Sequence, residues 1–232
     1  MSDGGLLPIV TGAASDASKP FSEAVGKSLA DVWQGIVGDR VAAWRINNAA
    51  DISKKLDAKL AAKNMKIERD KISDRYAFTW FEEASKQDEP EIQELFAQLL
   101  LNASQGDSDA LDRRHLSTLS QFTPIDALVF DRLFYPKNGE LRIAGIVPSL
   151  PRWSHQSMVS LLARELGDQA PNSLEHLINL GVLARGFKLE TGVNTRMLGS
   201  GGPAVNLTVN NEIIATGLGW SLHLALKNTD DQ

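Results

Sequence analysis

The sequence predicts a mainly α protein, with a helical N-terminal two thirds followed by a winged-helix-like α+β C-terminal unit. Apolar residues recur every three or four positions through most of the first 135 residues, as they do in amphipathic helices. The pattern then changes to two helical segments followed by two strand-like runs around a glycine-rich connection. We therefore divide the chain into a flexible start at 1–19, a helical domain at 20–135, a linker at 136–151 and a winged-helix-like domain at 152–228.

The helical domain begins with two amphipathic segments. In residues 20–37 the apolar positions follow helical spacing, and Pro20 stands in the first turn, where a missing N–H costs nothing. Residues 41–63 repeat the pattern, with lysines at positions 54, 55, 59 and 63. We favour a bundle in which these helices pack against others. The alternative is a peripheral membrane effector that uses residues 20–63 as an interfacial surface.

Charge is unevenly distributed along the helical domain. Residues 40–76 carry ten Lys and Arg against five Asp and Glu, whereas residues 82–112 carry nine Asp and Glu against one Lys. The simplest interpretation is that the two regions attract each other within the fold. The alternative is a basic arm for an anionic partner, either a membrane surface or nucleic acid.

The core of the helical domain is predicted between residues 76 and 100. Asp88 is a candidate cap, and Pro90 stands in the first turn of a helix whose apolar residues follow the spacing i, i+3, i+4, i+7, i+8. We expect these side chains and the preceding aromatic pair to be buried together. The predicted core residues are Trp80, Phe81, Leu95, Phe96 and Leu99.

Another helix is expected to start at Thr123, after a short helical segment at 115–122. Pro124 then stands in the first turn and Asp126 lies three residues after the cap, which is the arrangement of a capping box. The stretch 136–151 contains three prolines and an Asn-Gly pair, so it interrupts the helical pattern and serves as the linker.

The C-terminal unit contains a helical pattern at 154–166 and a second one from Asn172 or Ser173 onward, which Gly181 ends. The remaining predicted elements are strand-like runs at 188–189 and 205–209 and a last helix at 217–226.

No catalytic, cofactor-binding or metal-binding constellation is recognisable, so we expect a protein that is not an enzyme and uses no cofactor. The chain has no cysteine, and none of its four histidines stands three or four residues from the acidic cluster at 82–94. The glycine-rich loop at 199–202 lacks the Lys-Ser/Thr of a phosphate-binding loop. The start has no signal-peptide pattern and no long apolar run occurs, which predicts a cytoplasmic protein.

The second helix of the C-terminal unit occupies the place of a recognition helix. The candidate contact residues on it and just after it are Glu175, His176, Asn179, Arg185 and Lys188. A DNA reader usually presents Arg, Lys, Gln or Asn supported by further cations, so a leading Glu and a formal net charge of −5 oppose that role. We expect a protein partner or self-association; nucleic acid and a membrane surface are the disfavoured partners.

Five stretches of the chain resemble the abortive-infection alpha family of bacterial proteins. They are Lys19-Pro20 with VGKSL at 25–29, EIQELFAQLL at 91–100, LSQFTPIDA at 119–127, LEHLINLGVL at 174–183 and IIATGLGWSL at 213–222. The resemblance implies phage defence by abortive infection and supplies no catalytic residues. Our hypothesis is a non-enzymatic interaction protein of phage defence; the alternatives are a winged-helix nucleic-acid-binding protein and the peripheral membrane effector.

Overall fold

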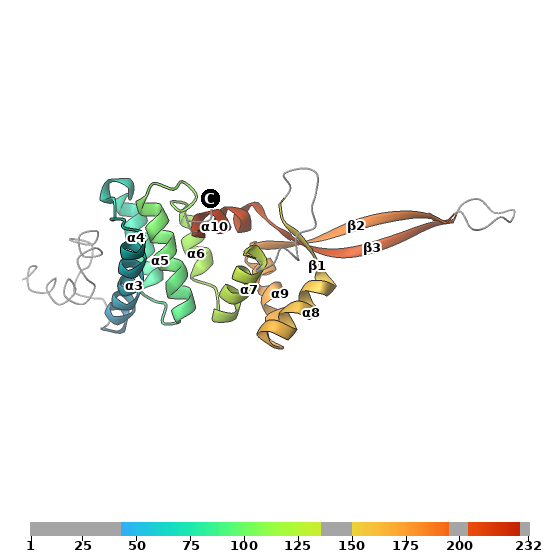
Figure 1. The fold of residues 1–232 in the computed structure, drawn as a ribbon, viewed down its shortest axis with the longest axis horizontal. Coiled ribbons are helices and arrows are strands. Elements are labelled where there is room, and N and C mark those ends of the chain that lie inside the picture. Colours follow the sequence, from blue (N-terminus) through green and yellow to red (C-terminus); the bar gives the residue numbers. More distant parts are fainter. Residues whose placement is uncertain (1–42, 136–149, 195–203, 228–232) are drawn as a thin grey trace, which may run out of the picture. The chain divides into compact units, whose positions relative to one another are not determined.

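The computed structural model describes residues 43–135, 150–194 and 204–227, and these residues form a mainly helical protein with one three-stranded antiparallel sheet in the C-terminal part (Figure 1). The chain divides into two compact units, Met1–Leu116 and Ser117–Gln232. The helix that Thr123 caps lies in the second of these units. The predicted start at 1–19, the predicted helix at 20–37 and nearly all of the predicted linker lie outside the described residues.

The N-terminal unit is helical throughout its described part. Its elements are α3 (Ala43–Ala62), the short 3-10 helix η1 (Arg69–Lys71), α4 (Asp74–Ala84), α5 (Pro90–Ser104) and α6 (Arg113–Leu119), the last of which runs across the division between the units. The start of α5 differs in detail from the prediction. Glu89 occupies the cap position without a side-chain hydrogen bond, so Asp88 is not the cap, while Pro90 stands in the first turn as expected.

Four of the five residues predicted for the core of this unit are buried. Trp80, Phe81, Phe96 and Leu99 are buried, whereas Leu95 is only partly so because it stands at the edge of the apolar stripe of α5. The Trp80 indole N–H donates a hydrogen bond of 3.0 Å to the carbonyl oxygen of Phe96. Since the two rings also meet edge to face with centroids 6.4 Å apart, one aromatic pair joins α4 to α5 through both apolar and polar contacts.

The apolar face of α3 is used inside the bundle. Ile52, Leu56 and Leu60 are buried, and α3 packs against α5 and α4. The opposite charges of these helices also meet: the Lys59 ammonium lies 2.5 Å from the Glu94 carboxylate, and the Arg45 guanidinium lies 3.1 Å from the Glu82 carboxylate. Basic and acidic helices thus attract each other within the fold, as the charge distribution predicted.

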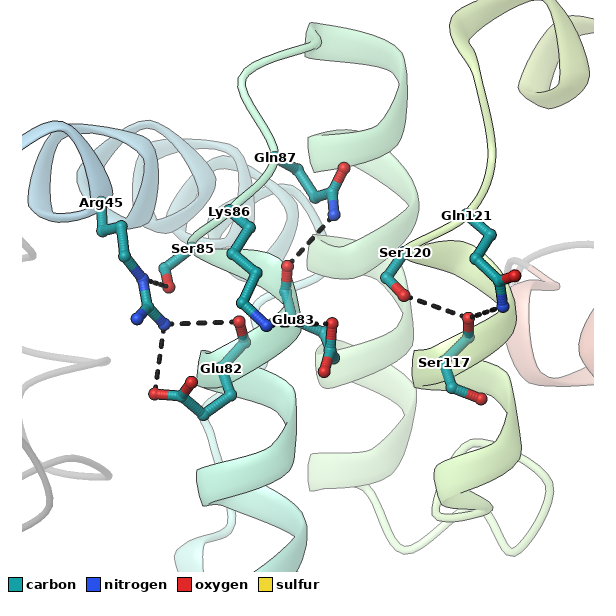
Figure 2. A network of polar contacts seen from close by, with 9 residues as sticks. All are labelled: Arg45, Glu82, Glu83, Ser85, Lys86, Gln87, Ser117, Ser120 and Gln121. Atoms are coloured by element: carbon teal, nitrogen blue, oxygen red, sulfur yellow. Dashed lines mark hydrogen bonds and ion pairs between the residues drawn. The ribbon is translucent and has the colours of Figure 1, made fainter.

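Side chains satisfy the last carbonyl groups of α4, as Figure 2 shows. Arg45 donates to the Glu82 carbonyl at 3.3 Å and to the Ser85 hydroxyl at 2.9 Å, and Gln87 donates to the Glu83 carbonyl at 3.2 Å. The last carbonyl groups of a helix have no partner within it, so these contacts stabilise its end. At the end of α6, the side chains of Ser120 and Gln121 both donate to the Ser117 carbonyl.

The C-terminal unit combines helices with the sheet. Its elements are α7 (Pro124–Phe134), β1 (Arg152–Ser154), α8 (His155–Leu166), α9 (Ala170–Asn179), β2 (Leu183–Asn194), β3 (Ala204–Ala215) and α10 (Gly217–Leu226). The strand order is β1-β3-β2, and both pairings are antiparallel. The sequence predicted two short strands; β2 and β3 are longer than expected, and β1 was not predicted because three residues are too few to show a period of two.

The ends of the C-terminal helices follow local rules with one exception. Gly181 adopts φ +75° just after α9, as the predicted helix stop requires, and the Thr216 hydroxyl accepts from Gly219 N–H at the start of α10. The prediction that Asn172 or Ser173 caps α9 is wrong, because the helix already begins at Ala170. None of the helices in the described part of the chain combines the length and apolar character needed to span a bilayer.

Candidate partner-contact site on the C-terminal unit

The start of α7 is built around the buried carboxylate of Asp126. The Thr123 hydroxyl accepts from the Asp126 N–H at 3.3 Å, and Asp126 Oδ2 accepts from the Thr123 N–H at 2.8 Å and from its hydroxyl at 2.7 Å. This is the capping box that the sequence predicted. Asp126 is nevertheless only 1% exposed, which a capping box alone does not require.

The same carboxylate binds α9. Ser173 donates its hydroxyl to Asp126 Oδ1 at 2.5 Å, and His176 Nδ1 lies 2.7 Å from Asp126 Oδ2. Because an ionised carboxylate only accepts, His176 carries its proton on Nδ1 in this contact. Asp126 therefore ties the start of α7 to the middle of α9, and His176 is a packing residue as well as a partly exposed one.

These residue types resemble a catalytic triad, but their geometry differs from one. In a triad the serine hydroxyl hydrogen-bonds the histidine, which acts as its base, and the aspartate holds the other side of the ring. Here the Ser173 hydroxyl donates to Asp126 instead, so the histidine does not activate it. The cluster holds two helices together and offers no activated nucleophile.

The outward face of α9 carries an ion pair. The Glu175 carboxylate lies 2.6 Å from the Arg185 guanidinium on β2 and 4.0 Å from the His155 ring. The hydrogen bond that Arg185 donates to the Glu175 carboxylate raises the pKa of Arg185. Two of the five candidate contact residues thus neutralise each other, and Asn179 is exposed at the end of the helix. Lys188 lies on β2 opposite Asn210 in the register. Its side chain is not among those that the structure describes.

Pairing with glutamate is general among the arginines of this unit whose side chains are described. The four pairs are Arg132–Glu165 at 2.5 Å, Arg152–Glu212 at 3.4 Å, Arg164–Glu165 at 3.7 Å and Arg185–Glu175 at 2.6 Å. The Arg132 guanidinium also lowers the pKa of the Glu165 carboxyl group. Glu165 is shared by Arg132 and Arg164, so these four arginines lie beside three glutamates.

The described residues contain no group of three or more His, Asp and Glu side chains placed to hold a metal ion. The functional residue that sequence reasoning missed is Asp126, which it assigned to the capping box alone. Its second role depends on Ser173 and His176, which are 47 and 50 positions away in the chain. No local sequence signal reports a contact at that separation.

Comparison with known proteins gives one result. The family model described as abortive infection alpha matches residues 47–197, which include most of α3, the helices from α4 to α9, and the whole of β1 and β2. No curated protein and no solved structure matches the chain. The match covers well over half of the sequence, and the chain belongs to the abortive infection alpha family.

Proposed function

We propose that this protein acts in the bacterial cytoplasm in phage defence by abortive infection, and that it works through contacts with other proteins rather than by catalysis. Membership of the abortive infection alpha family supports the setting. The proposed mode of action rests on the surface of the C-terminal unit, where each arginine whose side chain is described lies beside a glutamate. Such a surface of mixed charge suits a protein partner better than a phosphate backbone.

The geometry around Asp126 supports a role without catalysis. Its carboxylate is occupied by hydrogen bonds from Thr123, Ser173 and His176, which fix α9 against α7. A fixed α9 presents Glu175 and Asn179 in a constant arrangement, and Glu175 pairs with Arg185 of β2. Pre-organisation of this kind favours recognition, because fewer side chains and helices have to be ordered on binding.

Phage challenge tests the setting. A bacterium expressing the chain and one carrying an empty vector are infected with a panel of phages at low and at high phage-to-cell ratios. We expect fewer plaques, culture survival at the low ratio and culture collapse at the high ratio, because infected cells die before releasing progeny. Plaque numbers equal to those of the empty vector for every phage, with the protein present and folded, would contradict the proposal.

The second candidate function is nucleic-acid binding by a winged-helix unit. The element order α7, β1, α8, α9, β2, β3 and the sheet order β1-β3-β2 favour it. Duplex binding is measured at low and at physiological salt. We expect weak binding that disappears at the higher salt, because few phosphates would be neutralised. Sub-micromolar binding at physiological salt that is lost in the Arg185→Ala/Lys188→Ala variant would make this the leading function.

Membrane association through residues 20–63 is the remaining alternative. The burial of Ile52, Leu56 and Leu60 in the bundle argues against it for the part of this segment that is described. In flotation with anionic and with neutral liposomes we expect the full chain to stay with the unbound fraction in both cases. Salt-sensitive flotation with anionic liposomes alone, lost on deleting residues 1–63, would favour the membrane effector instead.

A further inference from the structure

The partly exposed ring of His176 ends a hydrogen-bond network that begins in the interior of the unit. Helices α7 and α9 pack against each other (Figure 1), and Asp126 on α7 is 1% exposed. The His176 side chain is 39% exposed, and its Nδ1 lies 2.7 Å from Asp126 Oδ2. Because the Nδ1 edge of the ring faces this buried carboxylate, the exposed part of the ring is the opposite edge, which carries Nε2.

The hydrogen bonds around Asp126 determine which ring nitrogen of His176 carries the proton. The carboxylate accepts from the Thr123 N–H, from the Thr123 hydroxyl and from the Ser173 hydroxyl. A carboxylate that receives these donors is ionised, so it can only accept from His176 as well. The proton therefore stays on Nδ1, and the neutral ring presents Nε2 at the surface as a hydrogen-bond acceptor.

No full positive charge balances the buried carboxylate of Asp126 while His176 is neutral. Its described partners are two hydroxyl groups, one backbone N–H and the imidazole ring. The N-terminal end of α7, where Asp126 lies, supplies only roughly half an elementary charge. Buried charges in proteins are normally paired with opposite ones. The His176 ring lies between this negative charge and the solvent, so a cation at Nε2 would complete the pairing.

We propose that His176 Nε2 accepts a hydrogen bond from a lysine or arginine side chain of the protein partner, with Asp126 as the positioning residue behind the ring. A charged donor is favoured over a neutral one, because the Asp126 charge attracts it and charge-assisted hydrogen bonds are the stronger ones. A phosphate group would be repelled by the same charge. The proposal rests on the proposed function, in that it names the chemical class of the group by which the partner contacts α9.

The neighbours of His176 on α9 suit a cationic donor. Asn172 and Asn179 stand four positions before and three positions after His176, so they lie beside it on the same face of the helix. Both are exposed and uncharged, and their side-chain carbonyl oxygens can accept further N–H groups of a guanidinium or ammonium. Arg185 is held 2.6 Å from the Glu175 carboxylate, so its charge is directed to Glu175.

Nitrogen NMR of the full chain labelled with ¹⁵N-histidine tests the proposal, and the resonances lost in His176→Gln identify the His176 ring. At neutral pH we expect a protonated Nδ1 and an unprotonated Nε2, which a merely structural histidine does not require. The probe is N-acetylarginine amide, and its matched control is N-acetylcitrulline amide, which has nearly the same shape without the charge. The arginine probe should shift the Nε2 resonance in a saturable way, and the citrulline probe should bind roughly tenfold more weakly.

Asp126→Asn removes the charge behind the ring. The new side-chain oxygen can take the place of Oδ2, which accepts from Thr123 and His176, while the amide group faces Ser173, whose hydroxyl can accept. The proton should therefore remain on Nδ1 of His176. The arginine probe should bind roughly tenfold more weakly than to the wild type, because the attraction of the carboxylate is lost.

A second pair of variants leaves the Asp126 network intact, so it remains informative if Asp126→Asn does not fold. Asn179→Arg places a cation one turn from His176, where it repels the arginine probe or occupies its site, and it should weaken binding roughly threefold or more. Asn179→Gln keeps a neutral amide at the same exposed position and should bind like the wild type. Far-ultraviolet circular dichroism and urea unfolding verify that each variant is folded.

Several results would overturn the proposal. They are a protonated Nε2 at neutral pH, equal binding of the two probes, and binding of neither probe, which includes a site already filled by a cation of the same chain. Unchanged binding in folded Asp126→Asn, or equal effects of the two Asn179 variants, would also overturn it. Phage protection is scored separately. Selective probe binding without protection contradicts the proposed function alone, and protection without selective probe binding contradicts this inference alone.

Discussion

Replacing Asp126 with Ala should destabilise the C-terminal unit far more than an ordinary helix substitution. Asp126 is 1% exposed, and its two oxygens accept hydrogen bonds from Thr123 on the α7 side and from Ser173 and His176 on α9. The substitution removes the acceptor for all of them at once. It leaves the buried Ser173 hydroxyl and the partly exposed His176 ring N–H facing the methyl group of the new alanine.

The magnitude follows from these contacts. Loss of the capping box costs about 1 kcal/mol, and each of the two hydrogen bonds from α9 to the carboxylate contributes about 1.5–3 kcal/mol. The gross loss is therefore about 4–7 kcal/mol. Since the variant no longer has to bury a charge, part of this loss is recovered, and we expect a net decrease of about 3–5 kcal/mol in the free energy of unfolding.

Urea denaturation followed by circular dichroism measures this loss. Asp168→Ala is the matched control, because it is the same substitution at an exposed position of the same unit, and it should change the free energy of unfolding by less than about 0.5 kcal/mol. A double-mutant cycle with His176→Ala then isolates the coupling of the two side chains, expected at about 1–3 kcal/mol. If Asp126→Ala falls within 0.5 kcal/mol of the control, roughly the scatter of surface substitutions, the assignment of Asp126 as the link between α7 and α9 is refuted.

Three further substitutions test other parts of the structure by urea denaturation. Phe96→Ala should lower the free energy of unfolding by about 3–5 kcal/mol because Phe96 is fully buried. Phe78→Ala, at a side chain that is 50% exposed, should lower it by less than about 1 kcal/mol. Equal losses would contradict the assignment of Phe96 to the core. Gly219→Ala should cost about 1–3 kcal/mol because a Cβ there would overlap the Val182 carbonyl oxygen, while Gly217→Ala in the same helix meets open space and should be neutral. Burial lowers the pKa of His115, so below about pH 6.5 the unfolded chain binds a proton that the folded chain does not. The free energy of unfolding should therefore fall as the pH decreases below that value, and His115→Leu should reduce the slope; an unchanged slope would exclude His115 as its source.

Much of the fold could be predicted from the sequence where the signal is local. The start of α7 is an example, because Thr123, Pro124 and Asp126 carry the whole signal within four residues, and both hydrogen bonds of the capping box are present. The apolar stripe of α5 is another, since its period directly reports which face is buried. Strand β1 had no such signal: it consists of three residues and exists because β3 pairs with it.

The candidate site was less predictable, because its geometry depends on contacts between distant residues. The sequence indicated Glu175, His176 and Arg185 as outward positions of a recognition helix and its surroundings. It could not indicate that Glu175 pairs with Arg185, because that contact depends on the turn after α9 and on the register of β2. The charge that appeared available for a partner is therefore largely balanced within the unit.

The double role of Asp126 also decides which substitutions can report on partner contact. A change at His176 alters the exposed surface of α9 and, at the same time, removes one of the hydrogen bonds that hold α9 to α7. Loss of phage protection in His176→Ala would therefore have two explanations, one through recognition and one through packing. Asn179 is exposed at the end of the same helix, and its side chain takes no part in the Asp126 network within the described residues. A change of protection in Asn179→Arg with an unchanged free energy of unfolding would consequently assign α9 to the contact surface, which no substitution at His176 can do by itself.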